Sequence, residues 1–303
     1  MSPPRVAVVL KRSSWRKWVE EDSDARIASL IEAADETVLH MLPGHNQHLE
    51  TIDEVRRALA ELRADAVWYD QPHEFRVEGP CDLVLTVGGD GTLLAASHGI
   101  PPGVPLLGVN SAPTHSVGFF CAAKKGQVRE ALREALGGLL RRVELTRMRV
   151  ELNEAPLHNR VLNEALFCHV SPAATSRYIL RLVAKDDRIV DEEAQKSSGV
   201  WIGPAAGSTA AQRSAGGKIL ALSSEQIQYV VREPYHVTGQ ELRMTWGLVE
   251  KGGALVLRSK MRRASVFLDG GPVAHEVTIG DVLRMRRSDE PLVVLGLTQD
   301  GRR

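Results

Sequence analysis

The chain has 303 residues, of which 43% are hydrophobic and 25% are charged, and these values are ordinary for a soluble globular protein with a sizeable core. Lysine plus arginine and aspartate plus glutamate both number 38, so the formal net charge is zero. Neither nucleic acid nor a membrane surface is therefore indicated as a partner, and clusters such as 258–263 and 284–287 are read as solvated faces.

The cysteines and the N-terminus indicate where the protein works. Cys81, Cys121 and Cys168 are far apart and lack CxxC spacing, which argues against a disulfide framework or a zinc site. A strand begins at Val6, leaving no room for a signal peptide, and no apolar run approaches the roughly 18–20 residues of a membrane span. We expect a cytoplasmic protein with reduced thiols.

The first part of the chain alternates between apolar β-branched runs and segments with helical spacing. This alternation predicts an α/β domain with a largely parallel sheet. The helical segment at 51–64 is expected to open with a capping box of Thr51 and Glu54. In chain order, the expected elements are a strand at 6–10, a helix at 23–34, a strand at 36–42, a helix at 51–64, strands at 66–70, 81–87 and 105–110, and a helix at 126–136.

The second part of the chain consists of short strand-like runs separated by Gly, Pro, Asp and Ser turns. It predicts a β-rich, sandwich-like domain. We place the α/β domain at 1–125 and the β-rich domain at 126–284, and 285–303 either continues the second domain or completes the first. The expected strands lie within 160–170, 176–185, 199–203, 227–231, 254–259 and 264–271.

A glycine-rich turn follows the strand at 81–87, in the sequence TVGGDGTLLAAS (86–97). Gly88, Gly89 and Gly91 permit positive φ and remove the Cβ atoms that would keep a ligand away. A helix starting near Thr92 would direct unpaired N–H groups at a phosphate. A carboxylate beside a phosphate is repelled, so Asp90 is expected to hold a metal or to accept a proton from an attacking hydroxyl. The chain lacks the Walker motif and the protein-kinase motifs.

Two further stretches carry polar or small residues suited to a nucleotide. Asn163 and Glu164 are adjacent in the sequence. On a strand only one of the two side chains would reach a ligand, whereas at a bend both could. An amide beside a carboxylate suits ribose hydroxyls and the edge of a purine. Residues 203–219 are nearly free of large side chains, and there Gly207, Ser208 and Thr209 offer N–H and hydroxyl donors to phosphate oxygens.

The order of these three stretches resembles that of the NAD kinases. GGDGT, then NE some seventy residues on, then GSTA and SAGG further on, cover roughly residues 81–220. In more detail the chain resembles the divergent, mitochondrial-type branch. The stretches that suggest this branch are 108–121, 195–199, 232–234 and 258–271.

The resemblance implies ATP-dependent phosphorylation of the 2′-hydroxyl on the adenosine ribose of NAD, giving NADP, by a homodimer. Mg²⁺ would arrive on the triphosphate, because no carboxylate cluster marks a protein-built metal site; inorganic polyphosphate stays open as an alternative donor. Asp90 matches the proton-accepting aspartate. Gly88, Gly89, Gly91 and Thr92 match the phosphate loop, Asn163 and Glu164 the pair that holds the dinucleotide, and Thr209, Ala210 and Ser214 the segment around the adenosine half.

Three positions depart from the family pattern. Ser198 stands where most members have an aspartate, as in the mitochondrial-type branch, and 203–207 reads GPAAG in place of a segment containing TPTG. Ala211 replaces an aromatic residue, and losing such a contact costs on the order of 1 kcal/mol of binding. Both Ser198 and Ala211 are still expected to contact NAD.

Two other functions compete with this interpretation. A lipid kinase of the diacylglycerol or sphingosine type has a similar loop, but there it usually continues as GGDGTLNEV, whereas here the NE pair stands separately. A non-catalytic NAD(P)-binding sensor is favoured by Ser198 and Ala211 and opposed by Asp90, since a binding protein gains nothing from a carboxylate beside phosphate. His40, His45 and His48 fit no standard metal-binding spacing and are expected in a polar loop, where His45 could touch substrate.

Overall fold

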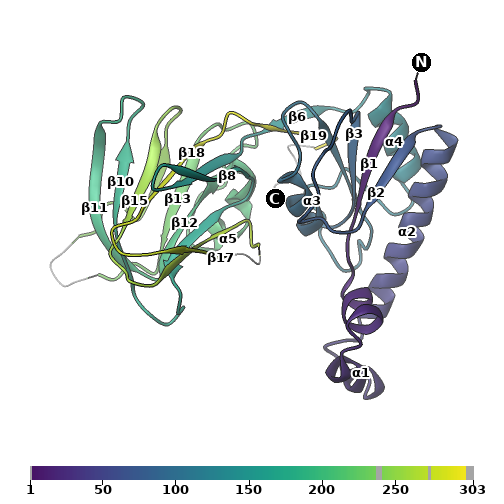
Figure 1. Ribbon diagram of the computed structural model, residues 1–303, viewed down its shortest axis with the longest axis horizontal. Helices are drawn as coiled ribbons and strands as arrows, with labels where there is room; N and C mark the ends of the chain where they lie inside the picture. The colour runs from purple at the N-terminus through teal and green to yellow at the C-terminus, as the bar shows by residue number, and fades with distance from the viewer. Residues whose placement is uncertain (1, 237–240, 272–273, 298–303) are drawn as a thin grey trace. The chain divides into compact units, whose positions relative to one another are not determined.

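The computed structural model describes residues 2–236, 241–271 and 274–297, and over these residues the chain divides into two units, labelled by element in Figure 1. Unit 1 contains residues 2–143 and 292–297, and unit 2 contains residues 144–291. The first unit therefore extends past the expected boundary at residue 125. Of the C-terminal segment 285–303, residues 298–303 lie outside the described part of the chain.

Unit 1 is built on a largely parallel sheet, as expected from its apolar, β-branched strands, with the strand order β2-β1-β3-β4-β19-β6 and β5 beside β4. The pairings β1–β2, β1–β3, β3–β4, β4–β5 and β4–β19 are all parallel. The strands are β1 (Arg5–Leu10), β2 (Asp65–Tyr69), β3 (Leu83–Gly88), β4 (Pro105–Asn110), β5 (Ala123–Lys124), β6 (Arg142–Leu145) and β19 (Leu292–Leu295). The helices are η1 (Arg16–Glu21), α1 (Ala25–Glu32), α2 (Met41–Glu61), α3 (Asp90–Ser97) and α4 (Val128–Leu136).

Helices cover both faces of this sheet, which is why its central strands are apolar on both sides. Val55 and Leu59 of α2 and Leu132 of α4 form one buried cluster with Leu85 of β3. The short helix α3 lies on the other side of the sheet (Figure 1). The central strands are thereby held rigidly, and their carboxyl ends carry the glycine turn.

The expected strand at 36–42 and the expected capping box of unit 1 are wrong. Residues 36–40 form turns and α2 begins at Met41, so there is no strand at 36–42. Pro43 is compatible with this helix because it lies in the first turn, where its missing N–H needs no partner. Thr51 is inside α2 and donates to the Gln47 carbonyl at 2.8 Å, while Glu54 accepts from the backbone N–H of Val128 at 2.9 Å. The expected capping box is absent, and Glu54 instead caps α4.

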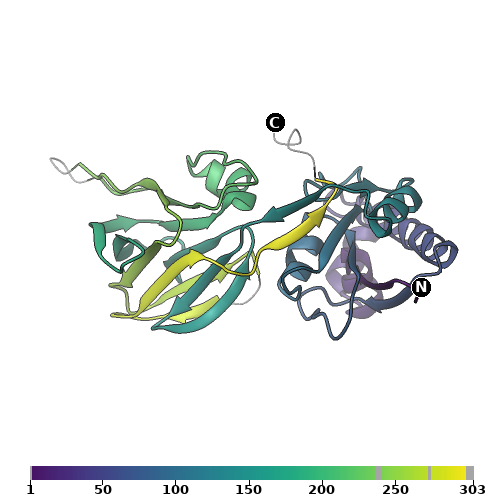
Figure 2. The same cartoon turned by 90° about the horizontal axis from the view of Figure 1, so that it is seen from above.

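Unit 2 is a sandwich of two antiparallel sheets, with the orders β11-β10-β15-β18-β7-β8 and β14-β13-β12-β9-β16-β17 (Figure 2). The strands of the first sheet are β7 (Met148–Leu152), β8 (Ala155–Val161), β10 (Ser176–Val183), β11 (Ile189–Ser197), β15 (Ala254–Ser259) and β18 (Val282–Arg287). Those of the second are β9 (Ala165–His169), β12 (Gly199–Pro204), β13 (Ile227–Arg232), β14 (Trp246–Val249), β16 (Ala264–Leu268) and β17 (Ala274–Val277). Two short helices, η2 (Ala205–Thr209) and α5 (Ala211–Ser214), follow β12.

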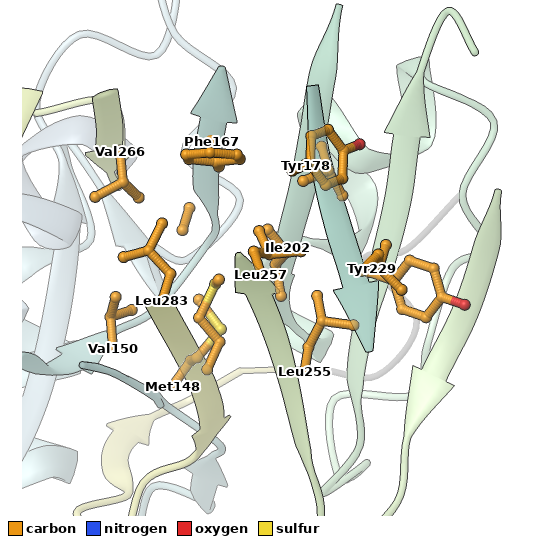
Figure 3. Packing of buried hydrophobic residues seen from close by; sticks show 14 of the residues in the cluster. Met148, Val150, Phe167, Tyr178, Ile202, Tyr229, Leu255, Leu257, Val266 and Leu283 are labelled. Atoms are coloured by element: carbon orange, nitrogen blue, oxygen red, sulfur yellow. The ribbon is translucent and has the colours of Figure 1, made fainter. Parts of the chain in front are cut away.

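The core of unit 2 lies between these sheets. Met148 and Leu257 of the first sheet and Ile202 of the second belong to one buried cluster (Figure 3). Phe167 and Tyr178 meet edge to face, with ring centroids 5.5 Å apart. Buried residues from both sheets form this core, in the sandwich that the sequence predicts.

The chain returns to unit 1 at its C-terminal end. Strand β18 continues the sandwich, and β19 then pairs with β4, so both expected uses of the C-terminal segment occur within its described part. Among the described helices, none is both long and apolar enough to cross a membrane.

Candidate active site

The glycine turn joins β3 to α3, which begins at Asp90, two residues before Thr92, with Gly89 as its N-cap residue. None of the three glycines has positive φ, so that part of the expectation is wrong. Gly88 is required by packing instead, because a Cβ there would lie 2.2 Å from the Thr92 Oγ1. A Cβ on Gly91 would meet nothing within 4 Å. The backbone at Gly91 is therefore open to a ligand.

Asp90 is held in place by the segment that follows β4. Its Oδ2 accepts the backbone N–H of Phe119 and its Oδ1 that of Phe120, both at 2.8 Å. Each carboxylate oxygen can accept a second hydrogen bond, so a half-buried Asp90 can still receive a hydroxyl proton. Asp90 therefore sits in the first turn of α3 with a defined orientation and with acceptor capacity to spare.

The segment 111–121 is itself fixed to the sheet. The backbone N–H of Ser111 donates to the Gly88 carbonyl at 2.9 Å, and the Ser116 hydroxyl donates to Asn110 Oδ1 at 2.8 Å. At its end, burial and the nearby Asp90 charge raise the pKa of the Cys121 thiol to about 12. Cys121 is thus neutral at physiological pH and is not a nucleophile.

The expected polar loop of histidines is wrong. His45 and His48 are buried in α2, where His45 Nδ1 lies 2.8 Å from Ser13 Oγ. His48 bonds Ser111 Oγ through Nδ1 and the Lys11 carbonyl through Nε2, each at 2.9 Å. These bonds tie α2 to the segments that leave β1 and β4, next to the glycine turn. The i, i+3 spacing on a helix was a signal for this role.

Asn163 and Glu164 lie at a bend between β8 and β9, the arrangement that lets neighbouring side chains serve one ligand. Burial, and then the charge of Asp269, raise the pKa of Glu164 to about 7. Over the described residues, Asn163 Oδ1 and Glu164 Oε2 are buried and have no hydrogen-bond partner. Buried acceptors without partners are uncommon in folded proteins and occur at functional sites.

The stretch 203–219, which contains Gly207 and Ser208, packs directly against this bend. A Cβ on Gly207 would lie 1.9 Å from the Asn163 carbonyl oxygen, and Gln212 Nε2 donates to the same oxygen at 3.2 Å. Ser208 is buried, with its hydroxyl donating to the Ala205 carbonyl at 2.7 Å and accepting from the Leu220 N–H at 3.0 Å. Gly207 and Ser208 thus have structural roles, and their contact with phosphate stays a prediction.

A cavity of about 500 Å³ opens beside the same stretch. Arg232 faces the indole of Trp201, with its guanidinium carbon 5.7 Å from the ring centroid. The Ser198 hydroxyl donates to the carboxylate of Glu233. Trp201 and Arg232 were not recognised from the sequence, because an alternating strand does not reveal which face borders a ligand. The cavity is lined by Trp201, Ala211, Ser214, Ala215, Arg232 and Glu233.

The predicted site residues fall into two groups, one in each unit. Unit 1 carries Asp90 and the glycine turn with Thr92. Unit 2 brings together the pair at the bend and the stretch from Gly207 to Ser214, and Ser198 in the same unit donates to Glu233, which lines the cavity. Side chains of the described part of the chain include no group of three or more His, Cys, Asp or Glu placed to bind a metal ion.

Comparison with known proteins identifies the class to which these two units belong. Residues 24–139 match the family model described as the ATP-NAD kinase N-terminal domain. The chain is 33% identical over 268 residues to a "Probable NADH kinase" of Oryza sativa, covering 84% of this chain and 82% of the relative. It is 34% identical over 228 residues to the NADH kinase of Arabidopsis thaliana, covering 70% of this chain and 71% of that relative.

Two solved structures share the fold. One is an NAD kinase from Archaeoglobus fulgidus in complex with ATP, with a TM-score of 0.67 at 20% identity over 98% of this chain and 95% of that one. The other is a yeast NADH kinase complexed with NADH, with a TM-score of 0.67 at 15% identity. This match covers 99% of this chain and 86% of that one. The chain belongs to the NAD kinase family.

Proposed function

We propose that the chain transfers the terminal phosphate of ATP to the 2′-hydroxyl of the adenosine ribose of NAD(H), with Asp90 accepting the hydroxyl proton. As a member of the NAD kinase family, the chain is an ATP-dependent kinase of NAD(H). The proposal assigns the acceptor hydroxyl and the residues that act on it.

The observation that carries the proposal is the setting of Asp90. Two backbone N–H groups orient its carboxylate at the start of α3, beside the open backbone of Gly91. Phosphoryl transfer needs positioning and charge stabilisation more than covalent help from the protein. A carboxylate held in this way orients the attacking hydroxyl and takes its proton, while the N-terminal amides of α3 face the phosphates.

The dinucleotide would be bound by residues of unit 2. The buried oxygens Asn163 Oδ1 and Glu164 Oε2, which have no partner over the described residues, suit donors on ribose hydroxyls and on a base. The nearby cavity offers the indole of Trp201 to a planar ring and the guanidinium of Arg232 to a phosphate. In this proposal Trp201 supplies the aromatic surface that is absent at Ala211.

We also propose that the reaction requires Mg²⁺. The ion would be held mainly by the triphosphate, and Asp90 is the carboxylate of the glycine turn that could contact it. When bound, Mg²⁺ supplies neutralisation of the phosphate charge.

Finer features of the enzyme also belong to this proposal. We place the chain in the divergent, mitochondrial-type branch and expect it to accept NADH as well as NAD. Support comes from two plant relatives named as NADH kinases and from the motifs at 195–199 and 232–234. We further propose that the enzyme is a cytoplasmic homodimer, which sedimentation of the purified protein would test.

The experiment is a steady-state assay with NAD or NADH as acceptor and with ATP or polyphosphate as donor, each with and without Mg²⁺. The product is identified by ³¹P NMR as carrying a 2′-phosphate. We expect Mg²⁺-dependent formation of NADP(H) from ATP. Binding of NAD without product from either donor would instead support a non-catalytic sensor.

A further inference from the structure

Asp269 lies at the end of β16, directly opposite the bend that carries Asn163 and Glu164. The pairing of β16 with β9 ends at Leu268 and Ala165, so Asp269 is the next residue beyond that pair. Its φ is +51° and that of Gly270 is +64°, and the Gly271 N–H donates to the Leu268 carbonyl at 2.9 Å. Positive φ at both central residues, with an Asp-Gly sequence, is typical of a type I′ turn.

The carboxylate of Asp269 points back from this turn into the bend. Its Oδ2 accepts the N–H of Leu162 at 2.8 Å, and its Oδ1 accepts those of Asn163 at 2.7 Å and Glu164 at 3.0 Å. The N–H of Asp269 donates in return to the Glu164 carbonyl at 2.8 Å. Four hydrogen bonds thus join one residue to three consecutive residues of the bend.

We propose that Asp269 is a positioning residue for NAD(H) binding: its carboxylate gathers the amides of residues 162–164 and thereby holds the Asn163 and Glu164 side chains ready for the dinucleotide before it arrives. This inference rests on the proposed function, in which that pair binds NAD(H). Asp269 itself is not expected to touch the reacting atoms.

The geometry explains why this position needs a carboxylate. Three N–H donors converge on two acceptor oxygens, and an ionised carboxylate accepts at both without offering a donor. Asparagine would keep the left-handed backbone but would turn an NH₂ group towards one of the three N–H groups. Burial, and then the charge of Asp269, raise the pKa of Glu164 to about 7.

Side-chain amides also hold the bend, but they contact its Asn163 carbonyl and not its backbone N–H groups, which Asp269 holds. Gln212 Nε2 donates to the Asn163 carbonyl at 3.2 Å, and Gln228 Nε2 donates to Gln212 Oε1 at 3.0 Å. Trp246 Nε1 in turn donates to Gln228 Oε1 at 2.7 Å. This chain of buried amides fixes one carbonyl, whereas Asp269 fixes three amides.

The test compares Asp269→Asn with a matched control, Asp281→Asn. Asp281 lies in unit 2 and also accepts a backbone N–H, from Thr278 at 2.8 Å, on an exposed turn away from the bend. We expect Asp269→Asn to raise KM for NAD(H) at least tenfold and to leave KM for ATP within twofold. Asp281→Asn should leave both values unchanged. A merely structural role would lower the active fraction and the melting temperature without moving KM for NAD(H).

Two further measurements make each outcome decisive. If Glu164→Gln and Asn163→Ala both leave KM for NAD(H) unchanged, the pair does not bind NAD(H) and the proposed function of the pair has failed. If these two substitutions raise KM for NAD(H) but a folded Asp269→Asn protein does not, the positioning role of Asp269 is overturned. Hydrogen exchange on wild-type protein needs no variant to fold. We expect amides 162–164 to exchange slowly before NAD(H) is added, and protection that develops only on binding would also overturn the proposal.

Discussion

Asp90 and Asp269 both accept hydrogen bonds from consecutive backbone N–H groups, but they differ in burial and in the number of N–H groups that they bind. Asp90 takes two N–H groups, one on each oxygen, and retains acceptor sites for a substrate hydroxyl. Asp269 takes three and lies buried at a turn. The first arrangement suits a group that must exchange a proton, and the second suits one that must hold backbone in place.

His48 gives a pH prediction at this scale. Burial lowers the pKa of His48 to about 4, against about 6.5 in an unfolded chain, so the unfolded state binds more protons between these values. The free energy of unfolding should therefore fall as pH drops from 6.5 to 4, by on the order of 3 kcal/mol from this residue.

Urea unfolding of wild type and His48→Gln at several pH values measures this contribution. The free energies of unfolding of the two proteins should differ less at pH 4 than at pH 7, because the contribution of His48 is lost at low pH. Other titrating groups are the same in both proteins and cancel in this difference. A difference that stays constant with pH would contradict the account of His48.

Trp201 gives a binding prediction. Replacing Trp201 with Ala removes the aromatic wall of the cavity, and an aromatic contact is worth about 1 kcal/mol, or roughly fivefold in binding. KM for NAD(H) should rise by that factor and KM for ATP should not change. Trp18→Ala, which removes a partly exposed tryptophan of unit 1, serves as the control. Equal effects of both substitutions would rule out a base-binding role for Trp201.

At the scale of elements, local pattern predicted the strands and failed where side chains make distant contacts. The expected strands at 6–10 and 105–110 match β1 and β4 because buried parallel strands are apolar throughout, and the one at 66–70 matches β2, a half-exposed edge strand. The pattern at 36–42 has the same apolar character, but those residues lead into α2, whose histidines bond Ser13 and Ser111. No local signal reveals those partners.

The candidate site was predictable to a similar extent. The glycine turn and the bend at Asn163 were identified because their residue types are unusual beside buried strands. The hydrogen bonds of Asp269 were not, because it lies more than one hundred residues from the amides that it accepts. The stretch 258–271, which resembles the family, contains Asp269 but does not indicate its chemistry.

Gly91 offers a test of whether the glycine at this position of the turn serves the ligand or the fold. A Cβ there meets nothing within 4 Å, so Gly91→Ala should raise the free energy of unfolding by about 0.5–1 kcal/mol, since alanine favours a helix. The same methyl group would stand where phosphate approaches, so kcat/KM for ATP should fall at least tenfold.

The control is Gly44→Ala, in the first turn of α2, where the nearest contact of a Cβ is an ordinary 3.4 Å. It should gain stability without losing activity. If Gly91→Ala retained full activity, the open backbone of the turn would have no part in binding phosphate.

At the scale of the whole molecule, each unit has a core of its own and carries a different part of the chemistry. Unit 1 supplies the glycine turn and Asp90, and unit 2 supplies the buried acceptors and the cavity. The zero net charge adds no general attraction for polyanions, so recognition of ATP and NAD(H) must come from these local groups.

The central claim, that Asp90 accepts the proton of the attacking hydroxyl, is tested most directly by single-turnover phosphoryl transfer from ATP to NAD in Asp90→Asn. Asp24→Asn is the matched control, because Asp24 also accepts two backbone N–H groups at the start of a helix in unit 1. We predict a rate lowered by roughly 10²–10⁴-fold in Asp90→Asn, with NAD affinity by calorimetry unchanged. Transfer within threefold of wild type, or a loss explained entirely by weaker NAD binding, would contradict the account.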